Sequence, residues 1–485
     1  MSTLLISPHQ TRYDNFQKNS GFGIGSLFVL LSLASAIIIA INDSDRNDSY
    51  SWMPVLPVSY GVVSAFLCAN YKYFFKSITF TIISSGYFVK MVLYPLLSSL
   101  GNYLSFFSGY VQVIKIKEAI IYFSIEYLII MFVFYTSLSD ECTHYSRLQL
   151  ENTIYSTKTF SILIALLSGY LVFSYLYVEE LRTIYYLPTD IKIEELASIR
   201  WDNETIVARG SIKRYIYTLF LFIWPLVRYL LPVSLILKIY KKYNKTSKSV
   251  FLSGLCCFIP CIFLGGDNFA PFVAVAITLL VIRMLYGQHS NKLFSIVLII
   301  IVLILIVVIS SKLTALSNWR GANGVANIAQ LLNAYFPGVE NMALCMQIDA
   351  PNKLDTLFYD IYSGIPFAAT LFGLNGESFN TIYNSYTSTG GQIVPFSGNI
   401  GYYTSYILSP VVFAWVISIA IKYEKKAKQS CEYWIRYVYL LFSTYTSMSA
   451  VIYSSQIYIR FLFNVMVPIL LIRFVARLRI DKSKE

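Results

Sequence analysis

The sequence predicts an all-α protein built as a polytopic bundle of transmembrane helices. Of its 485 residues, 56% are hydrophobic and only 13% are charged, whereas soluble domains carry about 25% charged residues. Long apolar runs recur from one end of the chain to the other, which excludes a soluble enzyme with a single membrane anchor. The high hydrophobicity also excludes a disordered chain, and the runs lack the alternation of a membrane β-barrel.

Twelve apolar runs are predicted to cross the membrane, because a spanning helix needs about 20 predominantly apolar residues. The run 271–282 is short, and its span is expected to begin nearer Asp267. The first run has no small-residue cleavage site, so we expect a retained helix and not a signal peptide. The whole chain, 1–485, is thus one integral membrane domain. The predicted spans are 21–41, 53–69, 77–100, 119–138, 160–178, 215–237, 250–264, 271–282, 293–311, 402–421, 433–453 and 458–472.

Lysine and arginine predict the orientation, because they are enriched in the cytoplasmic loops of membrane proteins. With the N-terminus inside, the inner segments carry more basic residues over a shorter total length than the outer segments. The runs 238–248 and 422–428 supply much of this difference. Both termini are therefore predicted to be cytoplasmic. The formal net charge of +12 reflects this bias and attraction to anionic lipid head groups; no nucleic-acid-binding motif accompanies it, so nucleic acid is not an expected partner.

Two outer loops, 179–214 and 312–401, are too long to be simple connections. Within the second loop, the stretch 324–334 carries Val325, Ile328 and Leu331 at helical spacing. The stretch 354–372 carries apolar residues around few charges, so we expect both stretches to form helices that lie in the membrane surface. A long ordered loop on one face commonly carries function. The alternative is a cap that only covers the helix bundle.

Three ionisable residues fall inside apolar runs, where a charge is costly and commonly marks function. Lys90 and Glu126 lie on neighbouring antiparallel spans and could pair, either for function or only to orient the helices. Arg228 lies between Pro225 and Pro232, which we expect to break the helix on both sides. A buried arginine of this kind either binds a phosphate through its planar fork or forms a structural pair.

Further basic residues are predicted at the outer face of the membrane. Arg320 follows the ninth span, Arg460 opens the twelfth, and Arg209 belongs to the loop 179–214. Together they could form a cationic rim that suits a diphosphate head group. The alternative for each residue is a long basic side chain that reaches from a helix end into the head-group region.

The acid and base inventory of the outer face contains no histidine, because His9, His144 and His289 all fall on the cytoplasmic side of this topology. A buried carboxylate with a raised pKa can instead remove a proton from a hydroxyl group. No nucleotide-binding loop, nucleophile elbow or zinc-protease motif is present. The outer carboxylate candidates are Asp267, Glu340, Asp349, Asp355, Asp360 and Glu377.

The seven cysteines do not form a disulfide framework. Cys256, Cys257 and Cys261 cluster in the seventh span, where helix packing is favoured over metal binding because no histidine or carboxylate lies in that span. Only Cys345 lies in an outer loop, and we expect a membrane-impermeant reagent to reach it from outside.

The layout and three short stretches resemble a known family. Residues 334–341 (AYFPGVEN) and 391–395 (GQIVP) lie in the large loop, and 398–403 (GNIGYY) lies where that loop re-enters the membrane. They are similar to Wzy-type polymerases of O-antigen or capsule repeat units, which have many spans and a large outer loop in the second half. The resemblance implies a GT-C-like glycosyltransferase architecture in the bacterial inner membrane.

The resemblance also implies a reaction on the outer face of that membrane. A glycan linked to undecaprenyl diphosphate would be transferred to the next lipid-linked repeat, with undecaprenyl diphosphate as leaving group and no nucleotide, cofactor or metal. Membrane lipids and a chain-length regulator protein would be further partners. The implied roles are diphosphate binding for Arg320, Arg228, Arg460 and Arg209, the catalytic base for Glu340 or Asp267, and sugar stacking for Tyr335 and Trp319, two aromatics that would otherwise be interfacial anchors.

Two alternatives stay open. An O-antigen ligase is similar in layout, but that family relies on a histidine in the large outer loop, and residues 312–401 contain none. A lipid-linked oligosaccharide flippase would suit the charges inside spans, although a transporter should show repeated halves and mostly short loops.

Overall fold

The computed structural model describes residues 8–103, 113–138, 158–185, 212–263, 270–293, 295–296, 299–300, 310, 324–349, 353–365, 368, 376–386 and 393–473. Within these ranges the chain folds into helices, turns and short connections and contains no β-strand. The predicted all-α class is therefore confirmed.

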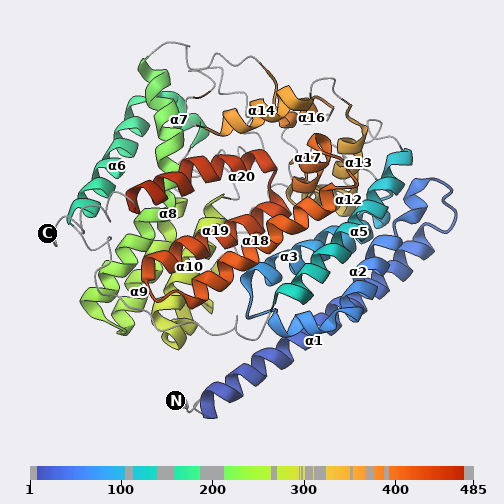
Figure 1. Cartoon of the computed structure of the whole chain (residues 1–485), viewed down its shortest axis with the longest axis horizontal. Helices are drawn as coiled ribbons and strands as arrows, with labels where there is room; N and C mark the ends of the chain where they lie inside the picture. Colours follow the sequence, from blue (N-terminus) through green and yellow to red (C-terminus); the bar gives the residue numbers. More distant parts are fainter. Residues whose placement is uncertain are drawn as a thin grey trace.

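Long helices form a bundle, and most of the short ones lie at one of its ends (Figure 1). The long elements are α1 (Pro8–Asn42), α3 (Ile78–Phe88) with its continuations η3 (Val89–Leu93) and α4 (Tyr94–Leu100), α5 (Val113–Ser137), α6 (Lys158–Tyr177), α8 (Ile212–Tyr243), α10 (Ala270–Tyr286), α18 (Ser409–Gln429) and α19 (Tyr433–Ile452). The shorter ones are η1 (Ser49–Trp52), α2 (Val55–Phe66), η2 (Cys68–Tyr73), α7 (Glu179–Ile184), α9 (Ser247–Leu255), η9 (Cys256–Cys261), η10 (Gly287–Ser290), α12 (Gly324–Tyr335), α13 (Val339–Gln347), α14 (Lys353–Gly364), α16 (Phe379–Ser385), α17 (Phe396–Tyr403), α20 (Ser455–Phe461) and η11 (Leu462–Met466).

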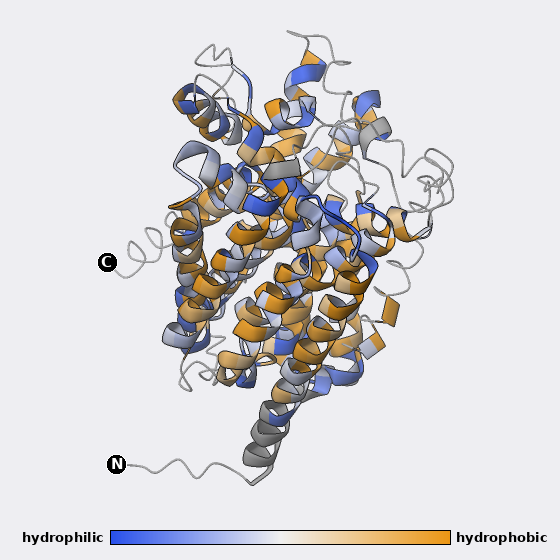
Figure 2. Ribbon diagram, turned by 90° about the vertical axis from the view of Figure 1, so that its right-hand side faces the viewer, coloured by the Kyte–Doolittle hydropathy of each residue, from blue (hydrophilic) through white to orange (hydrophobic). Residues whose placement is uncertain are grey.

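Six helical segments of the described chain are long and apolar enough to cross a membrane. They coincide with six of the predicted spans. Figure 2 shows that the helices between the two ends of the bundle are mostly hydrophobic, and that hydrophilic residues gather toward the ends. The six segments are Asn19–Asn42, Ile78–Leu100, Lys115–Ser137, Phe160–Tyr177, Ile212–Tyr243 and Ser455–Arg473.

The remaining predicted spans are shorter or less apolar than expected. The apolar segments Ser247–Cys261 and Ala270–Tyr286 have fewer than 18 residues, which is less than a typical hydrocarbon core requires. α2 has 12 residues. α18 and α19 have 21 and 20 residues, but α18 ends in a basic run and α19 is rich in Tyr, Ser and Thr. Most of the run 293–311 lies outside the described residues.

The prediction that Pro225 and Pro232 break the sixth span is wrong. α8 continues from Ile212 to Tyr243 with both prolines inside it. Each proline removes one backbone hydrogen bond, but α8 packs against α6, α9, η9 and α10. Neighbouring helices can stabilise a proline-containing helix at membrane depth.

The tenth predicted span, 402–421, begins later than expected. α17 ends at Tyr403, and Thr404 leaves the helical region with φ −110° and ψ −87°. α18 starts afresh at Ser409 with Pro410 in its first turn. A proline suits the first turn of a helix because its missing N–H would have no intrahelical acceptor there.

The large loop contributes ordered helices with a small core of their own. The predicted helix at 324–334 is confirmed as α12, whereas the stretch predicted at 354–372 is helical as α14 over Lys353–Gly364. Phe379 stacks on Tyr402 with ring centroids 4.0 Å apart. The core residues are Leu344, Cys345, Ile348, Phe379, Tyr383, Val394 and Tyr402. The loop helices also pack on the long helices, α12 on α4 and α13 on α5.

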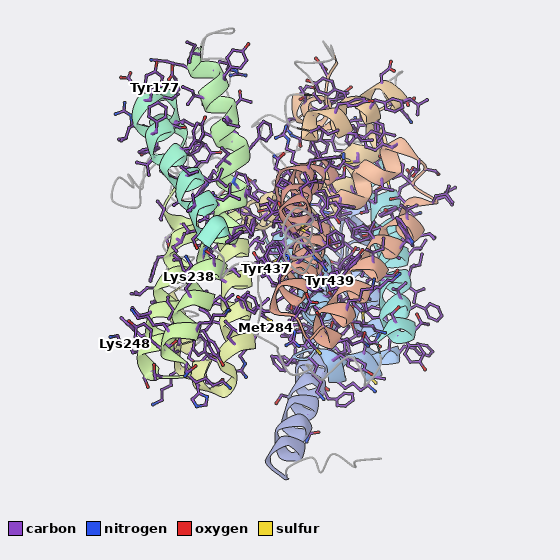
Figure 3. The ribbon with its side chains drawn as sticks, turned by 60° about the vertical axis from the view of Figure 1, so that its left-hand side comes forward. Tyr177, Lys238, Lys248, Met284, Tyr437 and Tyr439 are labelled. Carbon is purple, nitrogen blue, oxygen red and sulfur yellow. The ribbon has the colours of Figure 1, made fainter. Side chains whose placement is uncertain are left out.

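Segments predicted to face opposite sides of the membrane lie at opposite ends of the bundle. In Figure 1, α12, α13, α16 and α17 lie toward the upper right, whereas α1 begins at the bottom of the view and α9 lies toward the lower left. Figure 3 shows α6, α8, α9 and α10 as a group beside the other helices, with Tyr177 and Lys248 at its two ends.

A buried ion pair holds the basic end of α18 against the start of α3. Lys428 Nζ donates to Glu424 Oε1 at 2.8 Å, and both side chains are almost fully buried. The Glu424 carboxylate also accepts hydrogen bonds from the backbone N–H groups of Ile78 and Thr79 and from the Ser77 hydroxyl. It thereby satisfies N–H groups that a helix leaves without partners at its start.

Candidate functional site

The most unusual polar side chain of the large loop lies on the inward face of α14. This helix buries Thr356, Asp360 and Gly364 and exposes Leu354 and Phe358. The buried positions are four residues apart, so they form one side of the helix. The arrangement departs from that of a soluble amphipathic helix, because a carboxylate faces the protein while Leu354 and Phe358 face outward together with the charged Lys353 and Asp355.

Asp360 is 1% exposed and is held by groups from two other loop elements. Its Oδ2 atom accepts a hydrogen bond from the Tyr403 hydroxyl of α17 and one from the backbone N–H of Phe379 in α16, the latter at 3.3 Å. Its Oδ1 atom is buried and accepts no hydrogen bond from the described residues. The carboxylate therefore keeps one oxygen available for a proton.

The electrostatics of this position suit a base. Burial raises the pKa of Asp360 to about 6, and the Tyr403 hydroxyl, the Phe379 N–H and the positive charge of Arg460 offset part of that rise. A carboxylate with a pKa near the working pH is well matched to general base catalysis.

Arg460 lies beside Asp360 because α14 packs directly on α20. A Cβ atom on Gly364 would lie 2.6 Å from Ile459 Cγ2 and 3.3 Å from the Arg460 backbone nitrogen, so only glycine allows this close approach. The Arg460 side chain is exposed. Its guanidinium forms no direct ion pair with any residue that the structure describes. A cation that the fold leaves uncompensated is suited to bind an anion.

Two polar contacts fix the start of α20 beneath the loop. Gln456 donates from Nε2 to the Ser363 hydroxyl at 3.1 Å. The backbone N–H of Ser455 donates to Asn399 Oδ1 at 3.3 Å, and the Asn399 side chain is also close enough to interact with the Tyr403 hydroxyl. α14, α17 and α20 therefore meet around one polar site, which we call the Asp360 site (Asp360, Asn399, Tyr403, Gln456 and Arg460).

Arg228 is the second uncompensated cation. It is 5% exposed in the middle of α8, and its guanidinium carbon lies 4.6 Å from the centroid of the Trp224 ring. Its Nη2 donates to the carbonyl of Phe263 at 3.4 Å, and its Nε is buried and donates no hydrogen bond. No carboxylate among the described residues forms an ion pair with it, so the structural pair considered from the sequence is not found there.

The two arginines flank one contact between α8 and α20. Tyr229 follows Arg228 and Phe461 follows Arg460, and the Tyr229 and Phe461 ring centroids are 6.0 Å apart. The Tyr437 hydroxyl of α19, labelled in Figure 3, donates to the Tyr229 carbonyl at 3.0 Å. The helices that carry two of the four arginines predicted to bind diphosphate are thus in contact next to those arginines.

Glu340 lies elsewhere, on α13. It is fully buried, and the Tyr50 hydroxyl donates to its Oε1 at 3.1 Å. Tyr94 is also close enough to interact with this carboxylate. Glu340 therefore joins α13 to η1 and α4. Its predicted role as base stays a prediction, and its surroundings favour a structural contact.

Lys90 and Glu126 are both buried, as expected for charges at membrane depth. The Tyr87 hydroxyl donates to Glu126 Oε1, and Lys90 Nζ lies 5.7 Å from the centroid of the same Tyr87 ring. The two charges interact electrostatically but do not form the direct ion pair that the sequence suggested. Lys90 belongs to the π-helical turn η3, a distortion often found at functional sites.

The other predicted site residues divide into two groups. Tyr335 is half-buried at the end of α12, and its stacking role stays a prediction. Arg320, Asp267, Arg209 and Trp319 lie outside the described residues. In the described part of the chain, no group of three or more His, Cys, Asp or Glu side chains is arranged to hold a metal ion.

The prediction that Cys345 is accessible from outside is wrong. Its side chain is fully buried in the loop core, and the Tyr406 hydroxyl donates to its backbone carbonyl at 2.6 Å. Sequence position identified the correct loop but could not reveal that this loop has its own core.

Two features of the sequence point to the Asp360 site: the spacing of residues around Asp360, and the stretch 398–403. Asp360 was one of six carboxylate candidates, and Thr356 and Gly364 lie one turn on either side of it. Asn399 and Tyr403 belong to the stretch 398–403 that carries the family resemblance. The sequence shows that Thr356, Asp360 and Gly364 share one side of a helix, but it does not show that this side faces the protein.

Comparison with known proteins gives no relative: no family model, no curated protein and no solved structure matches this chain.

Proposed function

We propose that this protein polymerises oligosaccharide repeat units that are linked to undecaprenyl diphosphate, on the outer face of the bacterial inner membrane. The observation that carries the proposal is the Asp360 site, where a buried carboxylate with one oxygen unused by the described residues lies next to an exposed arginine that forms no direct ion pair with them. An enzyme that transfers a glycan from a diphosphate lipid needs both features.

The reaction assigns a part to each group. A hydroxyl oxygen of the acceptor repeat forms a bond to the anomeric carbon of the donor glycan, and the bond from that carbon to the diphosphate oxygen breaks. The hydroxyl proton passes to Asp360 Oδ1, and undecaprenyl diphosphate leaves with the electron pair. Arg460 and Arg228 offset the charge that develops on the diphosphate, which is commonly a large term in catalysis.

Asp360 lies on the inward face of α14, so the acceptor reaches it when this helix moves briefly away from α20, and the helix then returns to place Asp360 beside Arg460 for the transfer. Leu354 and Phe358 are exposed on α14, beside the exposed charges of Lys353 and Asp355, so such a movement would take place at the membrane surface. The further parts of the proposal are a twelve-span GT-C-like bundle, two cytoplasmic termini, and a chain-length regulator as partner. The basic runs at one end of the bundle and the loop helices at the other support this orientation (Figures 1 and 3).

The decisive experiment mixes the purified protein with an undecaprenyl-diphosphate-linked repeat unit of its host and separates the products by size. A ladder of multiples formed without any nucleotide is expected. An unchanged substrate under conditions in which the protein is folded would contradict the proposal.

A flippase for the same lipid is the second candidate, favoured by the buried charges of Lys90, Glu126 and Arg228. Liposomes that carry the lipid on one leaflet distinguish the two: movement across the bilayer without a ladder would identify transport.

A further inference from the structure

Arg460 occupies an unusual place for an exposed cation. It lies near the outer end of the segment Ser455–Arg473, which is apolar enough to cross a membrane and is only 28% buried. A side chain that is exposed on such a segment faces lipid, where an arginine is costly unless its head reaches the interface. The position therefore places a guanidinium at the boundary between the protein and the outer leaflet.

The same segment continues inward with an exposed apolar surface. Phe461, Val465 and Ile469 face the protein core, whereas Val467, Leu470 and Leu471 are 40%, 46% and 58% exposed. These three residues follow η11 on the helix that continues from α20, and we call them the α20 stripe. Leu471 lies about 16 Å further along the helix than Arg460 at 1.5 Å per residue. Cation and stripe thus follow each other from the head-group level into the hydrocarbon.

The helix is locally distorted between these two features. η11, Leu462–Met466, is a π-helical turn that begins two residues after Arg460. Such turns widen a helix by one residue and are frequent at functional sites. On the other side of Arg460, Gly364 brings α14 and the buried Asp360 against the helix.

We propose that Arg460 and the α20 stripe form the docking surface on which a polyprenyl diphosphate enters sideways from the outer leaflet. The guanidinium binds the diphosphate through its planar fork, and the stripe contacts the isoprenoid chain. The docked diphosphate then lies beside the Asp360 site. The inference rests on the proposed function for the identity of the lipid, and it adds the route by which that lipid arrives.

Photo-crosslinking in lipid nanodiscs tests the surface directly. The crosslinker benzoylphenylalanine replaces Val467 or Leu471 in the full chain, and the probe is radiolabelled undecaprenyl diphosphate. The matched controls place the crosslinker at Leu166 and Val172 of α6, which are 67% and 55% exposed. We expect crosslinking of the probe at the α20 stripe to exceed crosslinking at α6 by at least about tenfold, which corresponds to a modest difference in binding free energy. Crosslinking at the stripe should be lost in Arg460→Ala, because the guanidinium binds the diphosphate.

Three results would overturn the docking surface: equal capture at the stripe and at α6, capture that is unchanged in Arg460→Ala, or full displacement of the probe by an equal amount of phosphatidylglycerol. The last result would indicate a general anionic-lipid surface. The size-ladder assay on the same preparations separates this inference from the proposed function. A ladder with equal capture at all positions contradicts the docking surface alone, whereas selective capture without a ladder supports the docking surface and contradicts the polymerase.

Discussion

At the scale of single residues, the clearest feature is how differently the fold treats its buried carboxylates. Glu424 is neutralised by Lys428 and by backbone N–H groups. Asp360 receives two hydrogen bonds on one oxygen and none on the other, and burial raises its pKa to about 6. Glu126 shows the same asymmetry, because Tyr87 donates to its Oε1 and its Oε2 accepts no hydrogen bond from the described residues. What distinguishes Asp360 is its place beside the exposed Arg460, where α14 packs on α20, and this combination points to a chemical role.

Replacing Asp360 with Asn removes this role with little change of shape. The raised pKa shows that the fold disfavours the charge at this site, so a neutral side chain should be tolerated. Polymer formation should fall by about 10²–10⁴-fold, the usual contribution of a general base. The rate of ladder growth is the measurement, and Asp355→Asn, an exposed position on the same helix, is the control. Equal rates in the two variants would remove Asp360 from the mechanism.

The pH dependence of the reaction should report the same carboxyl group. The base must be deprotonated to accept the hydroxyl proton, so the rate should fall tenfold per pH unit below about 6 and level off above it. The rate of the first transfer step, measured from pH 4.5 to 8, gives the profile. The residual activity of Asp360→Asn should lack this acidic limb; an identical limb in the variant would assign it to another group.

At the scale of elements, the contact between α14 and α20 decides whether the site is assembled. Gly364 is the closest point, since any Cβ atom there would lie 2.6 Å from the branched Ile459 side chain. Gly364→Ala should therefore push α14 outward and cost about 1–3 kcal/mol of stability, as overpacking does. Activity should fall because Asp360 moves away from Arg460.

Gly169→Ala on α6 is the control for this change, because a Cβ atom there would meet nothing within 4 Å. Thermal unfolding in detergent and ladder growth together give the outcome. If Gly364→Ala behaves like Gly169→Ala in both measurements, the close approach of the two helices is not needed.

The elements themselves could be predicted in part. Hydrophobicity predicts the apolar helices, because every span must be long enough to cross the hydrocarbon core, must expose apolar side chains to lipid, and must satisfy its backbone hydrogen bonds within a helix. The spacing of apolar residues located α12. The continuity of α8 through two prolines could not be predicted, because it depends on helices that are distant in sequence.

At the scale of the whole molecule, the site could be predicted only as an inventory. Arg228, Arg460 and Asp360 were all candidates, but the sequence placed them in separate spans and loops. Asp360 and Arg460 interact because α14 packs on α20, and α8 contacts α20 next to Arg228, through Tyr229 and Phe461. Such long-range contacts leave no local pattern. The same reason explains why Glu340 ranked above Asp360, although the fold buries Glu340 against Tyr50.

The orientation of the molecule provides the last test. The proposed topology places α14 outside and the connection between α18 and α19 inside. Phe358 is 53% exposed on α14, and Cys431 is exposed in that connection. A Phe358→Cys variant, with the other cysteines except Cys345 and Cys431 replaced by Ser, should react with an impermeant maleimide on intact cells at position 358. Cys431 should react only after the cells are opened.

Cys345 should stay unmodified in both conditions, because burial removes access to its thiol and raises the pKa of that thiol. It should react once the protein is denatured, which provides the internal control for reagent and detection. Mass spectrometry of the labelled peptides separates the three positions. Labelling of Cys431 on intact cells would reverse the orientation, and the Asp360 site would then face the cytoplasm, where a polymerase of lipid-linked repeats exported to the outer leaflet could not act.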